Sequence, residues 1–219
     1  MKIVAVITAR GGSKGIPNKN IIDVKGKPLI YYSIQASKDS CMDETWVSTD
    51  CEKIAEVSDF YGARVLMRPP ELADDIVMPD EALIHFAEDQ DFDILVFIQP
   101  TSPLIKSIYI VEAVEMLISE ENTYDSVFTA HKYHWLPKWK YEEWDDMTPV
   151  GWDIKSRPRR QDIDQDVYIE NGMFYVTKRE SLLESNLRYS GNIGVYEIPL
   201  KDSFGVDTYD DLELIRRII

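Results

Sequence analysis

The chain has 219 residues, of which 44% are hydrophobic and 29% charged, a composition typical of one globular domain or a domain with a small lobe. Its formal net charge of −15 argues against nucleic acid or an anionic membrane as the main partner. No apolar run reaches the roughly 20 residues that cross a bilayer, so we expect no membrane segment.

The chain begins with a short apolar run, Met1–Ile7, that leads directly into a glycine-rich loop. Because no small-residue cleavage site follows, we expect a first β-strand here rather than a signal peptide. The two cysteines, Cys41 and Cys51, lack the spacing of zinc ligands and favour a reduced, cytoplasmic protein, with a disulfide as the alternative.

Along the first two-thirds of the chain, runs rich in β-branched or aromatic residues alternate with helix-like segments. The strand-like runs are Ile3–Thr8, Thr45–Thr49, Arg64–Met67, Ile94–Ile98 and Ser126–Ala130. The helix-like segments between them are Pro28–Ser37, Cys51–Tyr61, Asp80–Glu88 and Ile108–Ser119. Nearly continuous apolar strands separated by helices indicate a sheet covered on both faces. The sequence therefore predicts an α/β fold with a doubly wound, mostly parallel sheet.

Between His131 and Ile169 the pattern loses its period, and four tryptophans fall among charges and prolines. These are Trp135, Trp139, Trp144 and Trp152. A long aperiodic segment in a compact chain is usually functional or covered by a partner. We therefore predict a single domain over residues 1–219 with a small protruding arm at 131–169 that makes a homodimer contact, possible also in a tetramer. The alternative is an aromatic satellite core within one subunit.

The last quarter of the chain returns to alternating elements. The pattern predicts a strand over Val167–Thr177 that is interrupted at Asn171-Gly172, and then a helix over Lys178–Asn186. A strand over Ile193–Ile198 and a terminal helix from Thr208 complete the series. In an open α/β sheet, ligands bind beyond the carboxyl ends of the strands, so we look for a site in the loops that follow them.

The loop after the first strand combines three glycines with Arg10, Lys14 and Lys19. Glycines let the backbone approach a ligand and direct N–H groups at an anion, and the cations can neutralise a triphosphate. The loop fits neither the Walker A nor the dinucleotide pattern. Up to Ile30 the chain carries six cations against Asp23 alone, which indicates a local anion site or, alternatively, a solvated basic face.

The segment Ala9–Pro17, followed by Lys19 and Asn20, resembles the signature of the CMP-sialic acid synthetases, or acylneuraminate cytidylyltransferases. Further matching blocks follow in the same order: Trp46–Asp50, Arg68–Asp75, Gln99–Pro103, Tyr124–Phe128, Arg157–Asp162 and Glu170–Tyr175. The resemblance covers nearly the whole chain and implies a nucleotide-diphospho-sugar transferase-like fold. It also implies transfer of CMP from CTP to the anomeric hydroxyl of a sialic acid (N-acetylneuraminate) or a related nonulosonic acid, with release of pyrophosphate.

The resemblance further implies roles for individual residues. The catalytic set would be Arg10, Lys14, Lys19 and Asp207. Contacts to the nucleotide would come from Ala9, Arg10, Gly12, Asn20, Arg68 and Asp75. Contacts to the sugar would come from Gln99, Thr101, Ser102, Lys138, Arg159, Arg160, Asn171 and Tyr175, some of them across a dimer. Two alternatives stay open: Thr101 or Ser102 as a helix cap, and Tyr175 as a core residue with a satisfied hydroxyl.

The implied cofactor is Mg²⁺, or Mn²⁺ in its place, with Asp207 as the metal ligand. Gly205 stands where the family carries a first aspartate, so one carboxylate is absent. Asp207 or Thr208 could instead cap the last helix, with Asp211 in its first turn. Pro79 is a second departure, because many relatives have a serine near this position that touches the nucleotide.

The sequence leaves several acceptor sugars open. Gln99 favours a nonulosonic acid over KDO, because KDO-activating enzymes carry a Gly-Asp-Glu-Pro type sequence at this place. The same chemistry could still act on legionaminate, pseudaminate, deaminated neuraminate or KDO. A nucleotidyltransferase for another base and a non-catalytic nucleotide-sugar-binding relative are the remaining alternatives.

Overall fold

The protein is described by a computed structural model that covers residues 1–74, 76–134, 136–141, 147–163 and 167–219, without the side chain of Arg160. Within these residues, one sheet of seven strands has the order β11-β7-β10-β6-β1-β4-β5. Its strands are β1 (Ile3–Thr8), β4 (Glu44–Thr49), β5 (Arg64–Met67), β6 (Ile94–Ile98), β7 (Ser126–Lys132), β10 (Tyr168–Lys178) and β11 (Ile193–Glu197). Short 3₁₀ turns lie at Lys19–Ile21, Pro70–Ala73, Ile154–Ser156, Arg160–Asp162 and Leu200–Asp202.

The central strand β1 runs parallel to both of its neighbours, with Ala5 paired to Thr45 of β4 and to Val96 of β6. The pairs β4–β5 and β7–β11 are also parallel, whereas β10 runs antiparallel to β6 and to β7. The parallel strands β1, β5 and β6 therefore end at the same edge of the sheet. This arrangement confirms the predicted α/β fold with a mostly parallel sheet.

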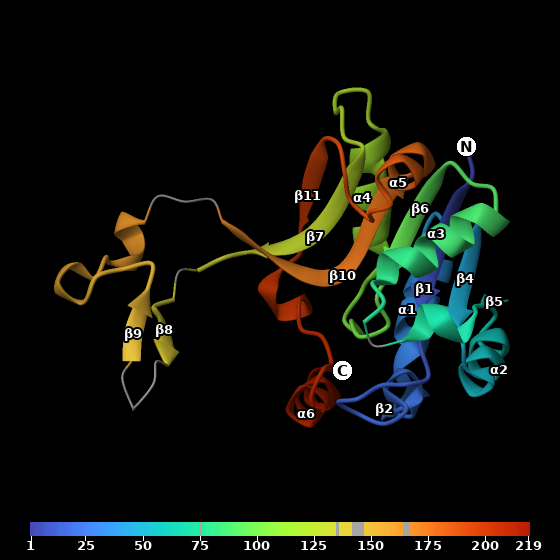
Figure 1. Cartoon of the computed structure of the whole chain (residues 1–219), viewed down its shortest axis with the longest axis horizontal. Helices are drawn as coiled ribbons and strands as arrows, with labels where there is room; N and C mark the ends of the chain where they lie inside the picture. The colour runs from blue at the N-terminus through green and yellow to red at the C-terminus, as the bar shows by residue number, and fades with distance from the viewer. Residues whose placement is uncertain (75, 135, 142–146, 164–166) are drawn as a thin grey trace.

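Helices cover both faces of the sheet (Figure 1). One face packs against α1 (Leu29–Lys38), α2 (Glu52–Phe60) and α4 (Ser107–Ile118). The other face packs against α3 (Pro79–Asp89) and α5 (Arg179–Ser185). Side chains of β1 alternate between the two cores, since successive residues of a strand point to opposite faces. The sheet is thus buried on both sides, as the apolar strand runs predicted.

A third apolar cluster joins the C-terminal helix α6 (Tyr209–Ile218) to the glycine-rich loop. Val206, Leu212 and Ile215 pack with Ile16 of that loop and with Leu104. Thr208 is the N-cap of α6 and forms a capping box with the third helical residue. This packing sets the residue before the cap beside the loop that follows β1. No helix in the described part of the chain is long and apolar enough to cross a membrane.

The predicted strands over β1, β5 and β6 are confirmed with the same bounds, and the predicted helix ends differ from the observed ones by one residue. The sequence analysis missed the small hairpin of β2 (Asp23–Val24) and β3 (Lys27–Pro28). Its turn consists of Lys25 and Gly26, both with positive φ, as in a tight hairpin turn. The strands of two residues are too short to show the alternation of apolar and polar residues by which a strand is predicted.

The chain leaves the body after β7 and returns along β10, and the segment between them projects as an arm (Figure 1). The arm carries the hairpin of β8 (Lys138–Tyr141) and β9 (Met147–Val150). Trp139 packs edge-on against Trp152 within the arm, with ring centroids 5.0 Å apart. Two of the predicted arm tryptophans, Trp135 and Trp144, lie outside the described residues.

Candidate active site

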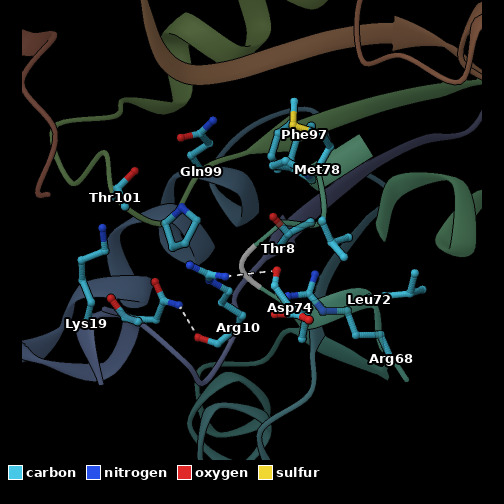
Figure 2. Close-up of a pocket in the computed structure, with 16 residues that line it drawn as sticks. Thr8, Arg10, Lys19, Arg68, Leu72, Asp74, Met78, Phe97, Gln99 and Thr101 are labelled. Atoms are coloured by element: carbon cyan, nitrogen blue, oxygen red, sulfur yellow. Dashed lines mark hydrogen bonds between the residues drawn. The ribbon is translucent and has the colours of Figure 1, made fainter. Parts of the chain in front are cut away.

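A pocket of about 290 Å³ lies beyond the carboxyl ends of β1, β5 and β6. Its walls are formed by the loop after β1, by Arg68 with residues 72–74 and 77–79, and by Phe97 with residues 99–101 (Figure 2). Six of the predicted site residues line it together: Arg10, Lys19, Asn20, Arg68, Gln99 and Thr101. Lys19 and Thr101 lie on one side of the pocket, and Leu72, Met78 and Phe97 lie on the other (Figure 2). The position agrees with the rule for ligand sites in open α/β sheets.

The glycine-rich loop is bound to the end of β4. The N–H of Ala9 donates to the carbonyl of Ser48 at 2.9 Å, and the N–H of Gly11 donates to Asp50 Oδ1 at 2.9 Å. A Cβ on Gly11 would lie only 2.9 Å from Cys51 Cβ, so glycine is required here for close approach. No role was predicted for Asp50 from the sequence, although it lies directly after a predicted strand and ends the matching block Trp46–Asp50.

Arg10 crosses the pocket from the first loop to the opposite wall. Its Nη1 donates to the carbonyl of Asp74 at 3.2 Å, and the buried Asn20 holds the Arg10 carbonyl through a 3.0 Å hydrogen bond (Figure 2). Lys14, also predicted for the triphosphate, is exposed and does not line the pocket. The structure therefore brings Arg10 and Asn20 into the site, whereas Lys14 is not among the residues that line it.

Arg68 is a buried cation with a spare donor. The residue is only 7% exposed, and its Nε has no hydrogen-bond partner. Burial lowers the pKa of Arg68, and the nearby Asp50 opposes this effect. A buried donor without a partner is costly, so such a group in a pocket points to an absent acceptor from a ligand. Asp75, predicted to act beside it, lies outside the described residues.

Lys19 Nζ lies 2.9 Å from Asp207 Oδ1, an ion pair between the first loop and the segment before α6. The Asp207 side chain is 81% exposed, which leaves it open to other partners. The helix-cap alternative applies to Thr208, because its hydroxyl oxygen accepts from the Asp211 N–H at 3.2 Å while Asp211 Oδ2 accepts from the Thr208 N–H. The hydrogen bond from the Thr208 N–H is the main cause that lowers the pKa of the Asp211 carboxyl. Asp207 itself is therefore not used as the cap.

Gln99 follows β6 and its backbone N–H donates to the carbonyl of Met173 at 3.0 Å. Gly172, with φ of 66°, lies so close that a Cβ there would be 3.3 Å from Gln99 Oε1. Ser102 is buried, and α4 begins only at Ser107. The alternative of Thr101 or Ser102 as a helix cap is therefore wrong.

Asn171 and Tyr175 lie behind the pocket rather than in its lining. Asn171 accepts from the Thr129 hydroxyl at 2.7 Å, which fixes the bulge of β10. Tyr175 is buried, donates to Glu170, and stacks on Phe97 with ring centroids 5.6 Å apart. Burial is the main cause that raises its pKa. The geometry of the single chain thus gives Tyr175 the core position that was the alternative.

The arm that carries β8 projects away from the body (Figure 1), and neither Lys138 nor Arg159 lines the pocket of its own chain. Lys138 Nζ lies 5.7 Å from the ring centroid of Tyr133, within the arm. The side chain of Arg159 is 72% exposed and pairs with Asp162 at 2.7 Å. The Arg160 side chain lies outside the described part of the chain.

The described residues contain no group of three or more His, Cys, Asp or Glu side chains that could hold a metal by themselves. Mg²⁺ in nucleotide sites commonly takes one or two carboxylates together with phosphate oxygens and water. The exposed carboxylate of Asp207 at the edge of a cationic pocket fits that kind of site. A Cβ on Gly205 would lie 3.3 Å from the Thr101 carbonyl, so this position is tight for a second carboxylate.

Comparison with known proteins identifies the family. Residues 4–141 match the family model described as "Cytidylyltransferase". The chain belongs to the cytidylyltransferase family. A relative of nearly the same length is the pseudaminic acid cytidylyltransferase of Campylobacter jejuni, 31% identical over 224 residues that cover 99% of this chain and 95% of the relative.

N-acylneuraminate cytidylyltransferase B of Danio rerio is 38% identical over 207 residues, which are 93% of this chain and 48% of the relative. The chain thus spans about half the length of several curated relatives that it matches. A structure of CMP:2-keto-3-deoxy-manno-octonic acid synthetase complexed with CTP superposes with a TM-score of 0.73, at 20% identity and over 100% of this chain and 98% of the other. This cytidylyltransferase shares its fold with that enzyme.

The close packing of Gly11 gives a testable difference between two neighbouring glycines. We predict that Gly11→Ala lowers the free energy of unfolding by about 1–3 kcal/mol, because the new Cβ meets Cys51. Gly12→Ala meets no atom within 4 Å and should leave stability unchanged or raise it by up to about 1 kcal/mol. Urea unfolding of both variants measures the difference, and equal stabilities would contradict the packing account.

Proposed function

We propose that this chain transfers CMP from CTP to the anomeric hydroxyl of N-acetylneuraminate or a related nonulosonic acid and releases pyrophosphate. The observation that carries the proposal is the meeting of Arg10, Lys19 and Arg68, whose Nε has no hydrogen-bond partner, in one pocket at the strand ends. The relatives named above, an N-acylneuraminate cytidylyltransferase and a pseudaminic acid cytidylyltransferase, support the choice of substrates.

In this reaction the sugar hydroxyl oxygen attacks the α-phosphorus in line, and the bond to the β-phosphate oxygen breaks. The chain must therefore hold two substrates in line and stabilise the charge that builds up on the leaving pyrophosphate. Arg10 and Lys19 supply positive charge from the first loop, and the exposed Lys14 of the same loop would add to it. Arg68 offers its buried donor to the nucleotide from the opposite wall.

The metal that this chemistry calls for is Mg²⁺, with Mn²⁺ as a substitute, and Asp207 is the residue that would hold it. When bound, the cation neutralises triphosphate charge and helps to orient the phosphates. In the described structure, Lys19 pairs with one oxygen of the Asp207 carboxylate. Asp207 thus positions Lys19 at the pocket edge while it keeps an exposed carboxylate for a cation.

For the sugar, Gln99 and Thr101 are the proposed contacts from this chain, since both line the pocket after β6. Gln99 favours a nonulosonic acid over KDO. Legionaminate, pseudaminate and deaminated neuraminate are alternative substrates within the nonulosonic acids, and KDO is an alternative outside them. The sugar carboxylate needs a cation, and a guanidinium can bind it through two parallel hydrogen bonds. Lys138 and Arg159 do not line the pocket of their own chain, so they would serve from a partner's arm.

A homodimer is therefore part of the proposal. The arm exposes large apolar side chains at Leu136, Trp139, Tyr141, Met147, Val150 and Ile154. An exposed apolar surface of this kind marks an association site.

Cys41 and Cys51 are free, which supports a reducing compartment such as the cytoplasm for the reaction.

Light scattering tests the arm. We predict a dimer for the wild-type chain and a shift toward monomer for Trp139→Glu, because a charge is costly to bury in an apolar contact. Phe60→Glu changes an aromatic residue that is 80% exposed outside the arm, and this control should remain dimeric. A wild-type monomer at all accessible concentrations, or a dimeric Trp139→Glu variant, would contradict the role of the arm.

The catalytic assignment is tested by pyrophosphate release with CTP, Mg²⁺ and N-acetylneuraminate. We predict that Lys19→Ala and Asp207→Ala each lower turnover by at least about 10²-fold, the scale for loss of one strong electrostatic contact. Matched controls are Lys25→Ala and Asp210→Ala, which remove exposed charges outside the pocket and should keep normal turnover. Near-normal turnover of a folded Lys19→Ala or Asp207→Ala variant would remove that residue from the mechanism.

A further inference from the structure

A buried ion pair lies behind the pocket wall that Met78, Pro79 and Phe97 form. Arg188 Nη2 lies 3.1 Å from Asp80 Oδ2, and the backbone N–H of Arg188 donates to Asp80 Oδ1 at 2.7 Å. The two side chains are 13% and 6% exposed. The contact at Asp80 Oδ2 is an ion pair without hydrogen-bond geometry, so the hydrogen bond of this carboxylate to Arg188 comes from the backbone N–H. A buried carboxylate is costly unless it is paired, so removal of Arg188 would leave the charge of Asp80 uncompensated.

The Arg188 guanidinium is surrounded by aromatic rings. Its central carbon lies 5.1 Å from the ring centroid of Tyr175, 5.9 Å from that of Phe97 and 6.0 Å from that of Tyr189. A planar guanidinium is suited to such stacked positions in a way that an ammonium group is not. Of these rings, Phe97 also lines the pocket, so the cation contacts the wall from behind.

At its other end the pair holds the start of α3. The N-cap of α3 is Met78, which makes no side-chain capping hydrogen bond, and Pro79 occupies the first turn. Both residues line the pocket. Asp80, the second residue of the helix, bonds Arg188, which lies outside the helix. This contact therefore holds the first turn of α3 in place. The negative charge of Asp80 also suits the helix N-terminus.

Arg188 is itself anchored to the far half of the sheet. The chain ends α5 with Asn186 in the left-handed conformation, and Ser190 then exchanges two hydrogen bonds of 2.9 Å with Ser126 at the start of β7. The ion pair thus links residues 108 positions apart and joins the loop after α5 to the wall at Met78 and Pro79.

We propose that Asp80 and Arg188 are positioning residues for the nucleotide, which hold the Met78–Pro79 wall at the distance from Phe97 that CTP requires. This inference rests on the proposed function, because it takes CTP as the ligand of the pocket. Neither side chain lines the pocket, so the pair acts through the wall and not by direct contact.

Calorimetric titration with CTP and Mg²⁺ tests the pair in the full chain. We expect Asp80→Asn and Arg188→Met each to weaken CTP binding at least about tenfold, since small displacements of positioning groups carry large costs. The double variant should bind CTP no more weakly than the weaker single variant, because the two side chains act as a unit. Lys178→Met, which removes the ion pair with Asp125 at the opposite end of the sheet, should bind CTP normally.

Thermal unfolding establishes that each variant is folded at the titration temperature. If Arg188→Met does not fold, the isosteric variant Asp80→Asn alone tests the proposal. In the turnover assay, the KM for CTP should rise while kcat at saturating CTP stays nearly constant. Binding within about twofold of wild type in a folded single variant, additive losses in the double variant, or a fall in kcat at constant KM would each overturn the proposal. A wild-type chain that binds no CTP would contradict the proposed function itself and this inference with it.

Discussion

The glycine-rich loop is held at the carboxyl end of β4 by the hydrogen bond from the Gly11 N–H to Asp50, and by the missing side chain that lets Gly11 lie against Cys51. Every proposed contact with the triphosphate depends on this placement. Arg10 reaches across to Asp74 from the loop, and Lys19 meets Asp207 because the same loop packs on the segment before α6. A parallel sheet makes the arrangement possible, since its strands deliver these loops to one edge.

The site also concentrates positive charge in a chain whose net charge is −15. Arg10, Lys19 and Arg68 face one pocket. Arg10 bonds the backbone carbonyl of Asp74, Lys19 pairs with the Asp207 carboxylate, and the charge of Asp50 lies near Arg68. A cleft lined by cations within low-dielectric walls attracts a polyanion even when the whole molecule is acidic. Arg188, behind the wall, is a further buried cation, and Asp80 compensates it directly.

The strands of the body could be predicted because a strand buried on both faces consists of a continuous run of apolar residues. The helices could be predicted from the segments between these runs. The loop of Arg10 and Lys19 was also visible, since its chemistry is local in the sequence. Asp50 and the Asp80–Arg188 pair were not, because their partners are 39 and 108 residues away and only the fold brings them together. For Tyr175 the resemblance implied the sugar site and a core position stayed open; in the single chain it is buried and its hydroxyl donates to Glu170.

The most direct test of the account is pyrophosphate release with Mg²⁺ for CTP, ATP, GTP and UTP, each with N-acetylneuraminate, legionaminate, pseudaminate or KDO as acceptor. The account predicts release from CTP with a nonulosonic acid and little release from the other three triphosphates. Such a result would also show that one aspartate, with Gly205 in place of a second, suffices for turnover. No release from CTP with any acceptor, or equal release from all four triphosphates, would contradict the proposed reaction.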